Sequence, residues 1–121
     1  MANHNLLGEK GEKIAVDYLV EKGWEILEKN WRFGKKEVDI IARKNATILI
    51  VEVKTRSTDY FGTPDEAVTI TKQRYLIEAA DYYLQQLSFD AEVRFDIISI
   101  ISTSSQTRVN HIEEAFIPLA E

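Results

Sequence analysis

Residues 37–56, with the sequence EVDIIARKNATILIVEVKTR, decide the fold of this chain. Two runs rich in apolar and β-branched residues, 38–43 and 47–54, flank a short turn at 44–46. This pattern predicts an antiparallel hairpin. The second run is apolar at every position from Ile48 to Val51, so we expect a strand that is buried on both faces.

Charged residues interrupt the apolar pattern where these two strands carry Asp39, Glu52 and Lys54. Successive side chains of a strand point to opposite faces, so Glu52 and Lys54 share one face. Asp39, on the preceding strand, can reach the same place. Charges near the end of a buried strand carry a desolvation cost, which favours a functional role for them.

These residue types suit a divalent-metal site. Hard cations such as Mg²⁺ prefer oxygen ligands and keep several waters. Asp39 and Glu52 suit the ligand role, the backbone carbonyl of Val53 could add a third oxygen, and Lys54 suits a water-orienting role. Glu12 lies beside the apolar stripe of a predicted helix and could reach the same metal or a second one. Clustered carboxylates repel one another, so we expect at least one of them to have a raised pKa.

Each residue also has a simpler interpretation. Asp39 alone could end a strand or cap a turn, and Glu52 with Lys54 could form an ion pair on one strand face. Glu12 alone could be a solvated helix residue. The residues alone leave the metal site and these structural roles about equally supported.

The remaining pattern predicts helices around a mixed sheet, which is an α/β fold. Apolar residues at three- and four-residue spacing predict helices over 8–22, stopped by Gly23, and over 71–87, with Thr71 as the N-cap. Strands are predicted over 24–31, over 94–101 near the centre of the sheet, and over 109–116 near an edge. Residues 61–65 read as a loop and 66–68 as a short helical piece.

Composition limits the function classes. At 121 residues we expect a single domain over 1–121. The chain has no cysteine, which excludes disulfides, thiolate zinc sites and a cysteine nucleophile. The sequence contains no secretory signal pattern and no apolar run near the roughly 20 residues of a membrane span, so we expect a cytoplasmic protein with no membrane partner.

The net charge of −5 counts against a protein that coats DNA, because non-specific affinity comes mainly from phosphate neutralisation. It counts less against a nuclease, in which acids bind metal and a local basic rim meets the substrate. Local basic clusters include Lys36 with its neighbours and Lys54 with Arg56. Solvated surface charge is the alternative interpretation of each cluster.

The ordered series of motifs resembles a known family. Asp39 followed by Glu52-Val53-Lys54 resembles the PD-(D/E)xK nuclease superfamily, although the position of the name-giving proline is Val38 here. Most of the chain is similar to the YraN-like family of small bacterial proteins related to Holliday junction resolvases. The further matching features are Gly8…Gly11-Glu12…Ala15…Tyr18-Leu19, Asn30-Trp31-Arg32, Thr55-Arg56, Phe61-Gly62…Pro64…Glu66-Ala67-Val68, Lys72-Gln73, Tyr83-Leu84 and Arg94-Phe95-Asp96.

The resemblance implies a restriction-endonuclease-like fold and a nuclease that uses Mg²⁺ or Mn²⁺. It implies that Asp39, Glu52 and Lys54 occupy catalytic positions, with Glu12 as the helix glutamate. It implies that Thr55, Arg56 and Gln73 lie near the nucleic acid. Lys36, from the basic clusters, is a further candidate for this contact. Arg94 with Asp96 reads as a strand-start ion pair.

Three functions follow as alternatives. The first is a metal-dependent nuclease acting on DNA, with branched or structured DNA as one substrate class. The second is a nucleic-acid-binding accessory protein that does not cleave, and the third is a protein-interaction domain with a structural Glu/Lys pair. A nuclease that cuts two strands symmetrically would favour a two-fold homodimer, formed through the 61–62 loop or the last strand.

Overall fold

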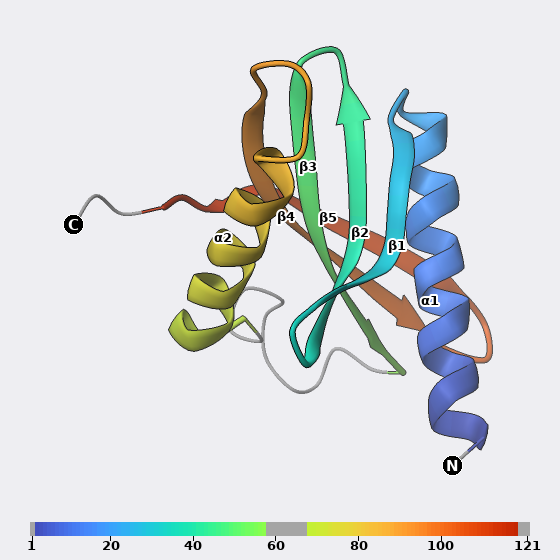
Figure 1. Ribbon diagram of the computed structural model, residues 1–121. Helices are drawn as coiled ribbons and strands as arrows, with labels where there is room; N and C mark the ends of the chain where they lie inside the picture. Colours follow the sequence, from blue (N-terminus) through green and yellow to red (C-terminus); the bar gives the residue numbers. More distant parts are fainter. Residues whose placement is uncertain (1, 58–67, 119–121) are drawn as a thin grey trace.

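The computed structural model describes residues 2–57 and 68–118, and the predictions for 61–65 and 66–67 lie outside this part of the chain. It is an α/β fold with a mixed five-stranded sheet between two helices, consistent with the restriction-endonuclease-like class (Figure 1). The elements in chain order are α1 (Ala2–Glu21), β1 (Glu25–Phe33), β2 (Lys36–Lys44), β3 (Thr47–Arg56), α2 (Ile70–Leu84), β4 (Glu92–Ser102) and β5 (Thr107–Phe116).

The strands lie side by side in the order β1-β2-β3-β4-β5. The predicted hairpin is confirmed, because β2 and β3 pair antiparallel around a turn at Asn45 and Ala46. β3 and β4 are parallel and are connected through α2, while β5 pairs antiparallel with β4 at the edge, as predicted. β4 is therefore an interior strand, next to the central strand β3.

The apolar side chains of the sheet form a separate core on each face. Figure 1 shows α1 beside one part of the sheet and α2 beside another. The core under α1 contains Ala15, Leu19, Trp24, Ile40, Ala42, Leu49, Val51, Ile98 and Ile100. The core under α2 contains Val38, Ile41, Ile48, Ile50, Val68, Leu76, Ala79, Ala80, Tyr83, Phe95 and Ile97. β3 contributes to both cores, which confirms the prediction of a strand buried on both faces.

Specific residues mark the end of α1 and the start of α2. α1 ends as predicted at Gly23, whose φ of +96° is open to glycine, and the N–H of Trp24 donates to the carbonyl of Leu19 at 3.0 Å. The prediction of Thr71 as the N-cap of α2 is wrong. Thr69 is the N-cap, because its backbone is extended and its hydroxyl accepts a hydrogen bond from the N–H of Lys72.

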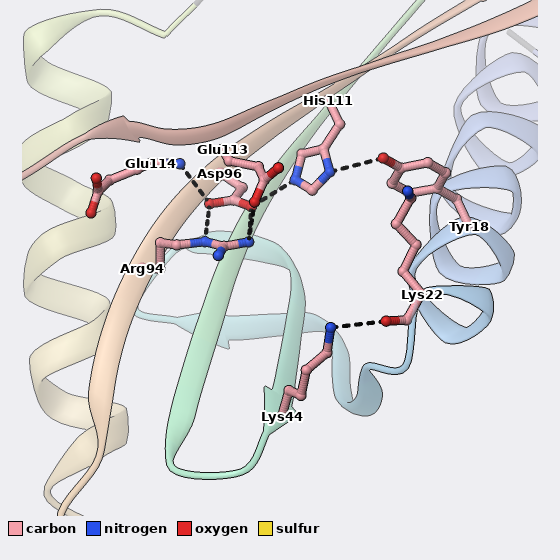
Figure 2. A network of polar contacts seen from close by, with 8 residues as sticks. All are labelled: Tyr18, Lys22, Lys44, Arg94, Asp96, His111, Glu113 and Glu114. Carbon is pink, nitrogen blue, oxygen red and sulfur yellow. Dashed lines mark hydrogen bonds and ion pairs between the residues drawn. The ribbon is translucent and has the colours of Figure 1, made fainter.

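A network of hydrogen bonds and ion pairs connects β4 with β5 and α1 (Figure 2). The buried carboxylate of Asp96 accepts two hydrogen bonds from the Arg94 guanidinium at 2.9 and 3.0 Å. The same carboxylate lies 2.6 Å from His111 Nε2, and His111 Nδ1 lies 3.0 Å from the Tyr18 hydroxyl. The ion pair that the sequence predicts at the start of this strand is therefore present. It is one part of a network that joins three elements.

No helix in the described part of the chain is both long enough and apolar enough to cross a membrane.

Candidate functional site

The separation of β2 from β3 creates the candidate site. The pairing of the two strands ends at Ile40 and Val51. Beyond this point β2 remains paired with β1 as far as Lys36, while β3 remains paired with β4 as far as Arg56. The two strands therefore diverge between the segments that carry Asp39 and Glu52.

Asp39 takes the place of a backbone partner in this gap. Its Oδ2 accepts a hydrogen bond from the N–H of Val53 at 2.8 Å. The N–H and C=O of one strand residue point to the same side, so the carbonyl of Val53 also faces the gap. Burial and then the neighbouring charge of Glu52 raise the pKa of Asp39 to about 7, against the opposing effect of the Val53 hydrogen bond. The expected raised carboxyl pKa is therefore confirmed, with burial as its largest cause.

Glu52 is a buried carboxylate shared by two lysines. Its side chain is 5% exposed, and its Oε2 lies 3.4 Å from Lys54 Nζ and 3.6 Å from Lys72 Nζ. Its other oxygen, Oε1, is buried and has no hydrogen-bond partner among the residues that the structure describes. A buried acceptor without a donor is costly, so Glu52 has the capacity for one further ligand.

Glu12 approaches the same end of the sheet from α1. Its Oε1 accepts a hydrogen bond from the Asn30 amide at 2.6 Å, and burial raises its pKa. The negative charge of Glu12 also contributes to the raised pKa of Asp39. Glu12 and Asp39 are therefore close enough to influence each other.

A cavity of about 400 Å³ brings most of the predicted site together. Its lining is made by Leu7, Gly8, Glu12, Asp39, Val53, Lys54 and Thr55. Glu52 is not part of this lining. Its carboxylate lies beside Lys54 and beside Lys72, which comes from α2. Gly11 lets α1 approach closely, because a Cβ at this position would overlap the side chain of Thr55.

The oxygen donors of this site are of the kind that a hard divalent cation prefers. Asp39 and Glu52 supply carboxylate oxygens, the Val53 carbonyl faces the gap, and Glu52 Oε1 lacks a partner in the described structure. The described residues contain no group of three or more Asp, Glu, His or Cys side chains arranged to hold a metal ion. A site built on these donors would therefore leave the other ligand positions to water, as Mg²⁺ commonly does.

Of the residues predicted to contact nucleic acid, one lines this cavity and the others lie outside its lining. Thr55 lines it, and Arg56 follows at the end of β3 with a half-buried side chain. Lys36, at the start of β2, lies over the Tyr75 ring with Nζ 5.4 Å from its centroid. Gln73 donates to the carbonyl of Val68 and lines a separate groove of about 860 Å³ between α2 and β4. The structure thus does not bring Gln73 to the cavity at Asp39.

Two residues of the site were not predicted as site residues. Lys72 reaches Glu52 from the first turn of α2, although the sequence indicated it only as a feature that matches the family. Asn30 has a φ of +50°, a conformation that asparagine tolerates better than most residues, and holds Glu12. Its distance of 18 positions from Glu12 hides this contact from any local pattern.

Comparison with known proteins places the chain among relatives of nearly equal length. The family model described as "Uncharacterised protein family UPF0102" matches residues 11–100. A UPF0102 protein of Bacteroides fragilis is 50% identical over 118 residues, which cover 98% of each chain. A UPF0102 protein of Christiangramia forsetii is 49% identical over 116 residues, covering 96% of this chain and 98% of the relative.

A third relative is similar over slightly less of its length. A UPF0102 protein of Thermodesulfovibrio yellowstonii is 47% identical over 110 residues, covering 91% of this chain and 95% of the relative. The match to the family model includes Glu12, Asp39, Glu52 and Lys54. The chain therefore belongs to the UPF0102 family, the YraN-like family that its sequence motifs predict.

Proposed function

We propose that this protein is a divalent-metal-dependent nuclease that hydrolyses phosphodiester bonds in DNA. The observation that carries the proposal is the gap between β2 and β3, with Asp39, Glu52 and Lys54 at its border and a buried, unpartnered oxygen on Glu52 among the described residues. Acidic oxygens that can hold a cation, with an ammonium group beside them, suit metal-assisted phosphodiester hydrolysis.

Each residue has a distinct role in this proposal. Asp39, Glu52 and the Val53 carbonyl would hold Mg²⁺ or Mn²⁺. When bound, the ion would neutralise charge that develops on the phosphate and favour deprotonation of a water molecule. Lys54, whose side chain is 34% exposed, can reach both its partner Glu52 and an incoming substrate. It would orient the attacking water and stabilise negative charge on the phosphate.

Glu12 would assist from α1. It lines the same cavity as Asp39 and Lys54, and Asn30 fixes one of its oxygens. The resolvase resemblance favours branched or structured DNA as the substrate. A test panel should therefore include a four-way junction, a flap, a single strand and a linear duplex, each labelled and incubated with Mg²⁺ or Mn²⁺.

A second function is supported by the pairing of Glu52. Because Lys54 and Lys72 both lie beside this carboxylate, its charge is compensated without an ion. This favours a nucleic-acid-binding accessory protein that does not cleave. Such a protein would bind DNA with an affinity that falls as salt rises and would release no product. Metal-dependent products that disappear in Lys54→Ala would rule out this alternative.

The purely structural alternative predicts a different result for the same variant. If the pair of Glu52 and Lys54 serves only the fold, breaking a buried pair should cost about 3–5 kcal/mol of unfolding free energy. The proposed function expects Lys54→Ala to cost less than Lys72→Ala, because it assigns Lys54 to catalysis and leaves Lys72 to compensate the charge of Glu52 in the fold. Chemical denaturation of Lys54→Ala and of Lys72→Ala, the matched control, distinguishes the two.

A further inference from the structure

Four aromatic rings gather where the end of β1 meets α2. Trp31 and Phe33 come from β1, and Tyr75 and Tyr82 come from α2. Trp31 stacks on Phe33 with centroids 6.1 Å apart and on Tyr82 with centroids 6.2 Å apart. Phe33 also contacts Tyr75 and Tyr82, with centroids 5.8 and 5.5 Å apart. We call these four residues the aromatic platform.

The platform lies at the rim of the core. Tyr82 is 52% exposed, and Trp31, Phe33 and Tyr75 are half-buried. Tyr83, which meets Trp31 edge to face, is buried and belongs to the core beneath. Large apolar side chains that gather in partial contact with solvent are more informative than single exposed ones, so the platform is a candidate binding surface.

Cations border the platform. Lys36 Nζ and Lys72 Nζ lie 5.4 and 5.8 Å from the centroid of the Tyr75 ring. Burial raises the pKa of the Tyr75 hydroxyl, the positive charge of Arg32 opposes this shift, and the negative charge of Glu37, which lies 3.9 Å from Arg32, adds to it. Rings interleaved with lysine and arginine suit a ligand that has both flat apolar faces and negative charge. Nucleic acid has both features, whereas an apolar protein segment has only the first.

Lys72 connects the platform to the candidate site. Its Nζ lies beside the Tyr75 ring and also 3.6 Å from Glu52 Oε2. A nucleic-acid strand whose phosphate reaches Glu52 and Lys54 would therefore bring its neighbouring nucleotides toward the platform.

We propose that the aromatic platform stacks unpaired bases, so that the preferred ligand is DNA with a single-stranded segment. Bases inside a duplex stack on one another and offer no free face to a protein ring, whereas unpaired bases do. The inference rests on the proposed function only for the position of the phosphate backbone. One stacked base on an aromatic ring changes affinity by roughly five- to 150-fold.

Binding in a metal chelator tests the platform without cleavage. The probes are a fluorescein-labelled blunt duplex and the same duplex with a single-stranded thymidine tail, and the measured quantity is the ratio of their Kd values. We expect the wild-type protein to prefer the tailed duplex and Tyr82→Ala to reduce this preference by about fivefold or more. Tyr82→Phe keeps the ring and should match the wild type. Val20→Ala removes an apolar side chain that is 54% exposed on α1 and should also match it.

The outcomes separate the platform from the nuclease. Equal affinity of the wild type for both probes, as a protein-docking surface would give, overturns the platform. An unchanged preference in Tyr82→Ala also overturns it. Lys54→Ala should keep the tail preference, so a failure to find cleavage removes the proposed function and leaves the platform standing. Cleavage with no tail preference removes the platform and leaves the proposed function standing.

Discussion

The carboxylate of Asp39 accepts a hydrogen bond from the backbone N–H of Val53, with Oδ2 and N 2.8 Å apart. This bond lies just beyond Ile40 and Val51, the last paired residues of β2 and β3. A side chain thus satisfies a backbone donor that would otherwise be left without a partner where the strands diverge. The candidate site is a direct consequence of this divergence.

Magnesium should stabilise the folded protein. An ion that binds only the native state adds about 2.7 kcal/mol at one hundred times its Kd, so we expect Tm to rise by several degrees at millimolar Mg²⁺. Asp39→Asn should remove most of this rise, because it removes a proposed ligand charge but keeps an acceptor for Val53. Differential scanning calorimetry measures the shift. Asp17→Asn, on the exposed face of α1, is the control that should retain it.

The absence of any magnesium-dependent shift in the wild type would contradict a preformed metal site. An equal shift in the wild type and Asp39→Asn would place the ion elsewhere on the protein.

Asp96 should make the fold sensitive to acid. Burial opposes the charged form, but hydrogen bonds from His111 and Arg94 outweigh it and hold the pKa of Asp96 below its usual value of 3.8. Because the folded-state pKa is lower than the unfolded one, the charged carboxylate stabilises the fold above about pH 4. This contribution is lost as the pH falls through the folded-state pKa.

Asp96→Asn should therefore lose on the order of 3–5 kcal/mol of unfolding free energy at neutral pH, because Arg94 and His111 lose their buried partner. The variant should also lose less stability than the wild type on acidification. Urea denaturation at neutral and acidic pH measures both effects. Equal acid dependence in the two proteins would show that the acid sensitivity comes from other carboxylates.

Gly11 and Gly8 should respond in opposite directions to alanine. A Cβ at Gly11 would overlap the Thr55 side chain, whereas a Cβ at Gly8 meets nothing within 4 Å. Gly8→Ala should gain about 0.5–1 kcal/mol from the lower backbone entropy of the unfolded chain. Gly11→Ala should lose about 1–2 kcal/mol, because overpacking outweighs the same gain. Denaturant midpoints give both values, and a stabilised Gly11→Ala would contradict the close contact of α1 with β3.

Asn30 should matter for activity through Glu12. The φ of +50° at Asn30 suits glycine but costs about 1–2 kcal/mol for alanine. Asn30→Gly should therefore stay nearly as stable as the wild type, and Asn30→Ala should not. Both variants lose the hydrogen bond to Glu12, so both should cleave about tenfold more slowly, the effect of about 1.4 kcal/mol in the transition state. Initial cleavage rates that match the wild type in both variants would remove Asn30 from a positioning role.

Much of the fold was predictable because it depends on local patterns. The apolar run from Ile48 to Val51 predicts a strand buried on both faces, and both cores use it. Gly23 stops α1, as predicted, and the structure shows that it does so in a left-handed conformation. The start of α2 was misplaced because Thr69 and Thr71 are both good N-cap residues. Only the extended backbone of Thr69 and its bond to Lys72 distinguish them.

The site was predictable in part for the same reason. Asp39, Glu52 and Lys54 stand out because charge interrupts apolar strands, and Glu12 because it lies beside the apolar stripe of its helix. Contacts between distant elements leave no local signal. The sequence therefore does not show that Lys72 reaches Glu52, or that His111 joins the predicted pair of Arg94 and Asp96.

Cleavage by the wild type and by Lys54→Ala, with Lys72→Ala as the matched control, tests the central claim most directly. Lys54 Nζ and Lys72 Nζ lie at nearly the same distance from Glu52 Oε2, 3.4 and 3.6 Å. Each variant therefore removes one ammonium group from beside this carboxylate, and only Lys54→Ala removes the proposed catalytic lysine. We predict metal-dependent products from the wild type, slower cleavage by Lys72→Ala, and no product from Lys54→Ala despite intact folding and DNA binding. Cleavage by Lys54→Ala at the wild-type rate, or no cleavage of any DNA substrate by the wild type, would contradict the account.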